Sequence, residues 1–201
     1  MDAVTGDDWY ISNDYQYVPG VTEVGGLFLL SRYPILWDDS PSGRLHVTLI
    51  DLPESISDKD LLVMNVHFVV DSDGQVVQAA DAADFVNEVL LGKIPQVPAD
   101  SMIMFCGDFN NQVTANTGAY PTISENTPLL SLSPSHLGWE GTNQYYTLGG
   151  VSYVGTNETQ IAESGYTPLE IHKKTIDFMF WQSTALEVKH ARIFNTLIMD
   201  D

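Results

Sequence analysis

Short, almost continuously apolar runs, separated by glycine and proline, dominate this sequence. Runs of this kind are typical of strands that are buried on both faces of a sheet, and glycine and proline mark the turns between them. We expect strands at Gly26–Ser31, Leu45–Leu52, Leu61–Val70, Met102–Cys106, Thr175–Trp181 and Leu186–Phe194.

One clear helix lies between two of these strands, from about Gln75 to Leu91. Asp71, Ser72 or Asp73 can cap its start, and Gly92 is well placed to end it. Apolar residues recur there at three- and four-residue spacings, which predicts a one-sided helix, at Val76, Ala80, Ala83, Val86 and Leu90. The stretch Leu61–Cys106 therefore predicts a strand–helix–strand unit within an α/β domain.

Length and charge narrow the class of protein. The 201 residues suit a single domain spanning 1–201, and a content of 44% hydrophobic residues excludes an acidic disordered chain. With 27 acidic and 8 basic residues, the net charge of −19 excludes a broad basic face that coats duplex nucleic acid. Neither a signal peptide nor a spanning helix is visible, and the single Cys106 excludes an internal disulfide framework. The sequence does not determine the oligomeric state.

The strongest local motif follows the predicted strand Met102–Cys106. Gly107 ends that strand, and Asp108 and Asn110 come two residues apart, so their side chains are expected to point the same way. A carboxylate beside an amide can bind a hard divalent cation or orient a water toward phosphorus. The alternative is an ordinary Gly-Asp turn after a core strand.

His67 closes the earlier strand of the same unit, as Asp108 closes the later one. If the two strands are parallel, both ends open on one edge of the sheet. There His67 can donate a hydrogen bond to a phosphoryl oxygen and stabilise a transition state. The alternative is a structural histidine with its hydrogen bonds satisfied inside the fold.

Asp177 interrupts the otherwise apolar strand Thr175–Trp181. A buried carboxylate needs a partner, because an unpaired buried charge costs several kcal/mol. We therefore expect one of two roles for Asp177. It orients a catalytic water or a neighbouring histidine, or it anchors a buried backbone turn.

Four segments, taken in order, resemble the endonuclease/exonuclease/phosphatase superfamily of metal-dependent phosphodiesterases. GGLFLLSRYPI resembles its Ser-Arg/Lys-x-Pro-Ile strand, LLVMNVHF its histidine strand, MIMFCGDFN its Gly-Asp-x-Asn motif and TIDFMFW its Ile-Asp-Tyr-like strand. The double glycine and the run Ala79–Asn110 are most similar to sphingomyelinases. The resemblance implies a deoxyribonuclease-like α/β fold, a four-layer mixed β sandwich of two sheets flanked by helices.

The resemblance also implies roles and a cofactor. His67 would stabilise phosphoryl oxygens, Asp108 and Asn110 would orient the water or hold Mg²⁺ (or another divalent cation such as Mn²⁺), and Asp177 would support the centre. Two family segments have no counterpart here: a strand-ending metal-binding Glu upstream of Gly25, and a terminal Ser-Asp-His segment. We therefore expect a partial domain, incomplete at both ends.

Three functions remain open from the sequence. The first is a sphingomyelinase-like hydrolase whose phosphodiester substrate is a membrane lipid headgroup, although this chain can be inactive as a fragment. The second is a nuclease or soluble phosphoesterase of the same fold. The third is a non-catalytic remnant or binding module.

Overall fold

The computed structural model describes residues 9–13, 27–42, 44–69, 71–111, 117–131, 143–148, 151–154, 171–174 and 177–187; for residues 13, 72, 143–148, 151–154, 171–174 and 177 it describes the backbone alone. The chain forms two compact units, and nearly all of the described residues belong to the first. The first unit covers 1–131 and 177–187, and the second covers 132–176 and 188–201. The single domain expected from the length remains a prediction.

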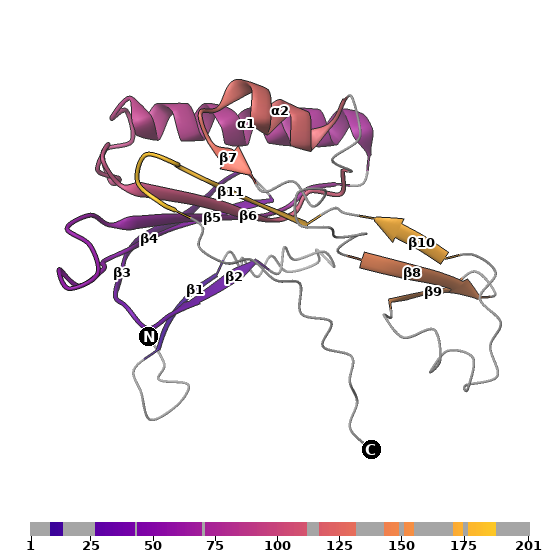
Figure 1. Cartoon of the computed structure of the whole chain (residues 1–201), viewed down its shortest axis with the longest axis horizontal. Helices are drawn as coiled ribbons and strands as arrows, with labels where there is room; N and C mark the ends of the chain where they lie inside the picture. Colours follow the sequence, from indigo (N-terminus) through magenta and orange to yellow (C-terminus); the bar gives the residue numbers. More distant parts are fainter. Residues whose placement is uncertain are drawn as a thin grey trace, which may run out of the picture. The chain divides into compact units, whose positions relative to one another are not determined.

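A six-stranded mixed sheet is the centre of the first unit (Figure 1). Its central pair, β5 and β6, is parallel, and every other neighbouring pair is antiparallel. In spatial order the strands are β3 (Ile35–Ser42), β4 (Leu45–Ile50), β5 (Leu61–His67), β6 (Met102–Asp108), β11 (Asp177–Trp181) and β7 (Leu130–Ser131).

Helix α1 (Ser72–Leu90) connects β5 to β6 and confirms the predicted strand–helix–strand unit. The Asp71 side chain caps the start by accepting a hydrogen bond from the Gly74 N–H at 2.8 Å. At the other end Gly92 is left-handed (φ 67°), and the N–H groups of Gly92 and Lys93 donate to the carbonyls of Val89 and Glu88. These paired bonds are a Schellman motif, for which the positive φ of Gly92 is required.

Replacing the cap, Asp71→Ala, should lower the free energy of unfolding by about 1 kcal/mol, because the Gly74 N–H loses its acceptor. Urea denaturation measures the change. Asp73→Ala is the matched control, since Asp73 is an acidic residue of the same first turn and not the cap. Equal urea midpoints for the two variants would contradict the cap assignment.

Helices α1 and α2 (Ala119–Asn126) cover one face of this sheet, and the hydrophobic core lies beneath them (Figure 1). The buried apolar residues of α1 are Ala79, Ala82, Ala83, Phe85, Val86 and Val89. Of the predicted stripe, Ala83 and Val86 are therefore buried, Ala80 and Leu90 are half-buried and Val76 is exposed. Phenylalanines from β6, β11 and the segments after β5 and β6 fill the centre. The rings of Phe68 and Phe109 meet edge to face at 5.3 Å, as do those of Phe109 and Phe178 at 5.5 Å.

A two-stranded sheet, β1 (Tyr10–Asn13) and β2 (Phe28–Ser31), packs on the opposite face. The buried Ser12 hydroxyl is the polar centre of this contact: Asp38 Oδ2 lies at 2.9 Å, His46 Nε2 at 2.6 Å and Thr48 Oγ1 at 3.0 Å. A carboxylate only accepts, so Ser12 gives its one proton to Asp38 and accepts from His46 and Thr48. Every hydrogen-bonding position of the Ser12 hydroxyl is thereby used.

The second unit contains a three-stranded antiparallel sheet in the order β10 (Ile171–Lys174), β8 (Asn143–Leu148) and β9 (Val151–Val154). Two of these strands and α2 fall inside Gln112–Pro168, the stretch in which the sequence predicts long loops with short elements. Among the described residues, no helix is long and apolar enough to cross a membrane.

Most predicted strands are confirmed, with shifted ends. β6 continues two residues beyond the predicted end, so Asp108 is its last residue, and the prediction at Leu186–Phe194 is wrong at its start. There the N–H groups of Ala185 and Leu186 donate to the Gln182 carbonyl, which makes a turn. Residues 188–194 of that prediction lie outside the described residues. The α/β class and the packing of a second sheet on the mixed sheet are confirmed.

Candidate functional site

Three neighbouring strands bring three of the predicted residues to one edge of the mixed sheet. In the backbone register, His67 at the end of β5 is the partner of Asp108 at the end of β6. Asp108 is in turn the partner of Asp177, the first residue of the antiparallel β11. The parallel arrangement expected of β5 and β6 is therefore confirmed. Only the backbone of Asp177 is described, so its predicted role remains a prediction.

Gly107 allows β5 and β6 to approach each other just before Asp108. Its φ is 136°, and a Cβ built there would overlap the Val66 carbonyl oxygen and lie 2.8 Å from the Val66 nitrogen. Val66 and Gly107 are register partners. The glycine of the Gly-Asp-x-Asn motif is thus required by the contact between two backbones, and it brings Asp108 beside His67.

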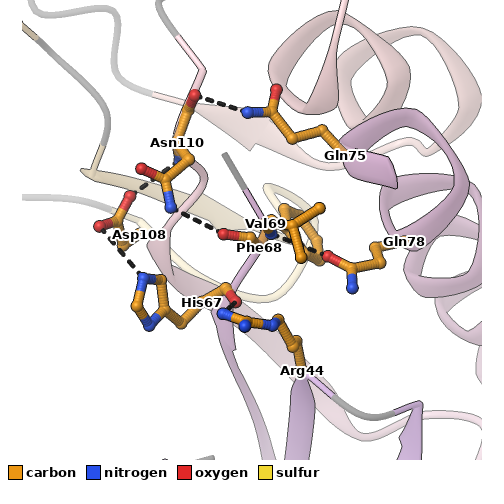
Figure 2. Close-up of polar contacts among 8 residues, drawn as sticks. All are labelled: Arg44, His67, Phe68, Val69, Gln75, Gln78, Asp108 and Asn110. Carbon is orange, nitrogen blue, oxygen red and sulfur yellow. Dashed lines mark hydrogen bonds and ion pairs between the residues drawn. The ribbon is translucent and has the colours of Figure 1, made fainter. Parts of the chain in front are cut away.

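Asn110 lies in a tight turn after β6, whereas the expectation that its side chain points the same way as that of Asp108 assumes an extended backbone. Its φ is 51°, in the left-handed region that asparagine tolerates better than most residues. Asn110 N–H donates to Asp108 Oδ1 at 2.8 Å, and Asn110 Nδ2 donates to the Phe68 carbonyl at 2.7 Å. The turn therefore joins the segments that follow β5 and β6 (Figure 2).

His67 and Asp108 face each other at the open side of this edge (Figure 2). His67 Nε2 lies 3.8 Å from Asp108 Oδ2, beyond hydrogen-bond distance, and the two side chains are 55% and 29% exposed. A ligand oxygen can therefore reach both groups. A protonated His67 would also be attracted by the Asp108 carboxylate.

Arg44, just before β4, holds the backbone of His67 on both sides. The His67 N–H donates to the Arg44 carbonyl at 3.2 Å, and Arg44 Nη1 donates to the His67 carbonyl at 3.3 Å. These contacts place one of the eight basic residues of the chain beside the site.

The first turns of α1 are bonded to both segments of the site. Gln75 Nε2 donates to the Asn110 carbonyl at 2.8 Å, and the Val69 N–H donates to Gln78 Oε1 at 3.0 Å (Figure 2). Sequence reasoning missed Arg44, Gln75 and Gln78. Their partners here are backbone groups distant in the chain, so no local motif marks them, although two glutamines one turn apart at a helix start are visible in the sequence.

The donor atoms of the site partly suit a hard divalent cation. Asp108 and Asn110 carry carboxylate and amide oxygens, the ligand types that Mg²⁺ prefers, and Mg²⁺ is often held by only one or two carboxylates together with water and substrate phosphate. No group of three or more His, Cys, Asp or Glu residues in the described part of the chain could hold a metal. Burial raises the pKa of the Cys106 thiol, so this residue of the same strand stays protonated and is a poor ligand.

Comparison with known proteins identifies the fold. No protein-family model matches the sequence, and a search of curated proteins found no match. Solved structures are similar. A Staphylococcus aureus beta toxin mutant with bound magnesium ions has a TM-score of 0.53 at 17% identity, covering 93% of this chain and 62% of that one.

Two further structures have the same fold. Sphingomyelinase C from Streptomyces griseocarneus has a TM-score of 0.50 at 15% identity, covering 86% of this chain and 57% of that one. TDP2 from C. elegans has a TM-score of 0.50 at 13% identity, covering 86% of this chain and 47% of that one. The chain thus has the endonuclease/exonuclease/phosphatase fold expected from its motifs. It spans 47% to 62% of the length of these three solved chains, in agreement with a partial version of the fold.

Proposed function

We propose that this site hydrolyses a phosphodiester with the help of a divalent cation, Mg²⁺ or Mn²⁺. The observation that carries the proposal is the register His67, Asp108, Asp177 across three adjacent strands, with Asn110 turned back onto Asp108. A phosphodiesterase fold and a similar structure with bound magnesium ions support it.

Each residue has a defined task in this proposal. His67 donates a hydrogen bond from Nε2 to a phosphoryl oxygen and stabilises the charge that develops on it. Asp108 and Asn110 hold the cation through their side-chain oxygens, or orient the attacking water. The cation, when bound, supplies positive charge that polarises the phosphoryl group. Asp177 supports this centre from β11.

The favoured substrate is the phosphodiester of a lipid headgroup, as in sphingomyelin. One structural neighbour is a sphingomyelinase C, and the resemblance of Ala79–Asn110 to sphingomyelinases points the same way. A net charge of −19 disfavours a duplex nucleic acid, whose binding needs basic residues along the backbone.

The decisive assay incubates the purified chain with sphingomyelin vesicles, with supercoiled plasmid and with bis(p-nitrophenyl) phosphate, each in Mg²⁺ and in chelator. Phosphocholine release that requires Mg²⁺ and is lost in His67→Ala is the expected result. Plasmid nicking with the same requirements would overturn the lipid substrate in favour of a nuclease. If Mg²⁺ accelerates none of the three reactions, the hydrolytic proposal is wrong and the binding-module alternative is preferred.

A further inference from the structure

We propose that Gln75 is a positioning residue of this site: by bonding the Asn110 carbonyl, it sets the orientation of Asn110 and so of the side-chain oxygens that Asn110 and Asp108 present. The proposal rests on the proposed function for its effect on hydrolysis. Its structural part, the control of Asn110 by Gln75, can be tested separately.

Asn110 depends on hydrogen bonds for its position, because its backbone lies in the left-handed region (φ 51°), which L residues, asparagine least of all, adopt only at an energetic cost. Its N–H and Nδ2 are bonded to Asp108 and Phe68, within the two segments that also carry the site. Gln75 provides the bond to its carbonyl at 2.8 Å. Gln75 is therefore the group that ties the Asn110 turn to the rigid helix α1.

The chemistry of the partners determines how each glutamine amide is oriented. A carbonyl only accepts, so Gln75 must present its Nε2 to Asn110. A backbone N–H only donates, so Gln78 must present its Oε1 to Val69. The two glutamines, one turn apart on the same helix, therefore use opposite ends of the same functional group.

Because the two glutamines use opposite ends of the amide, the same substitution, Gln→Glu, should disrupt the contact at position 75 and keep the contact at position 78. Gln75→Glu keeps the size of the side chain but, at a pH that keeps the new carboxyl group ionised, places carboxylate oxygens against the Asn110 carbonyl, where a donor is required. Gln75 is only 3% exposed, so water cannot readily replace the lost bond. Gln78→Glu keeps an acceptor oxygen for the Val69 N–H and is expected to retain that contact.

Three readouts follow the change at the site. In ¹H–¹⁵N NMR spectra, Gln75→Glu should shift the Asn110 and Asp108 amide signals, whereas Gln78→Glu should leave both near their wild-type positions. Broadening of the Asn110 signal by added Mn²⁺ should require about 10–100-fold more Mn²⁺ in Gln75→Glu, the usual cost of losing a group that supports a metal ligand. The value of kcat/KM for phosphodiester hydrolysis should fall by a similar factor of about 10–100.

Asn87→Ala controls for a general loss of stability. Asn87 Nδ2 donates to the Asn126 carbonyl at 2.9 Å, so this variant removes a side-chain-to-backbone bond from the same helix at a place that does not contact the site. We expect Asn87→Ala to lower the thermal midpoint while leaving the Asn110 signal and the Mn²⁺ concentration dependence unchanged.

The positioning role is wrong if Gln75→Glu and Gln78→Glu give the same spectra and the same Mn²⁺ dependence. It is also wrong if Gln75→Glu changes the Asn110 signal and the Mn²⁺ dependence no more than Asn87→Ala does. A wild-type chain that hydrolyses no phosphodiester overturns the proposed function alone. In that case the Asn110 signal still shows whether Gln75 positions this turn.

Discussion

Gly107→Ala should destabilise the protein by about 2–5 kcal/mol, a large part of the 5–15 kcal/mol that usually separates folded from unfolded domains. Two costs add. The φ of 136° is one that L side chains rarely adopt, and the new Cβ would overlap the Val66 carbonyl oxygen. The overlap can be removed only if β6 moves away from β5, and these two strands form the centre of the mixed sheet. Equilibrium urea denaturation measures the loss.

Gly92→Ala separates these two costs. Gly92 also has a positive φ, 67°, but a Cβ there would meet only the Ala99 Cβ at 3.4 Å, an ordinary contact. We expect this variant to lose only about 1 kcal/mol, the conformational cost of a left-handed L residue. If the two alanine variants unfold at the same urea concentration, the close approach of the two backbones at Gly107 is not the source of the effect.

The part of the site that could be predicted from sequence is the part made by strand ends. His67 and Asp108 each close an apolar run, and the ends of parallel strands meet at one edge, so their proximity followed from the strand–helix–strand pattern alone. The extent of β6 did not follow, because Gly107 looks like a strand terminator in a sequence. In the fold, Gly107 instead continues the strand at a place where only glycine fits.

The features missed by sequence reasoning depend on partners far along the chain. Helix α2 has no side-chain cap at its own first residues, and the Tyr120 N–H donates instead to Asn111 Oδ1, nine positions earlier. Strand β3, which was not predicted, is an outermost strand of the mixed sheet and pairs with β4 in an irregular register. Its sequence is mostly polar after Trp37, so it has no apolar run that would indicate a strand. Arg44 and Gln75 bind backbone carbonyls, which any sequence offers at every position.

Under the proposed function, Asp108→Asn should reduce phosphodiester hydrolysis by about 10²–10⁴-fold while leaving the fold intact. Asparagine has nearly the same shape, and its Oδ1 can still accept the Asn110 N–H that Asp108 Oδ1 accepts at 2.8 Å. What the variant loses is the negative charge facing His67 and available to a cation. The thermal midpoint should therefore change little, whereas the Mg²⁺ concentration needed for half-maximal rate should rise.

Asp84→Asn is the matched control, because it removes one negative charge from an exposed position on α1. Both variants change the net charge of the chain from −19 to −18, so any general effect of charge on substrate or Mg²⁺ binding appears equally in both. A large loss in Asp108→Asn alone therefore requires a local role for the carboxylate at the end of β6. Equal rates in the two variants would instead make Asp108 a turn-forming residue, for which an amide oxygen serves as well as a carboxylate.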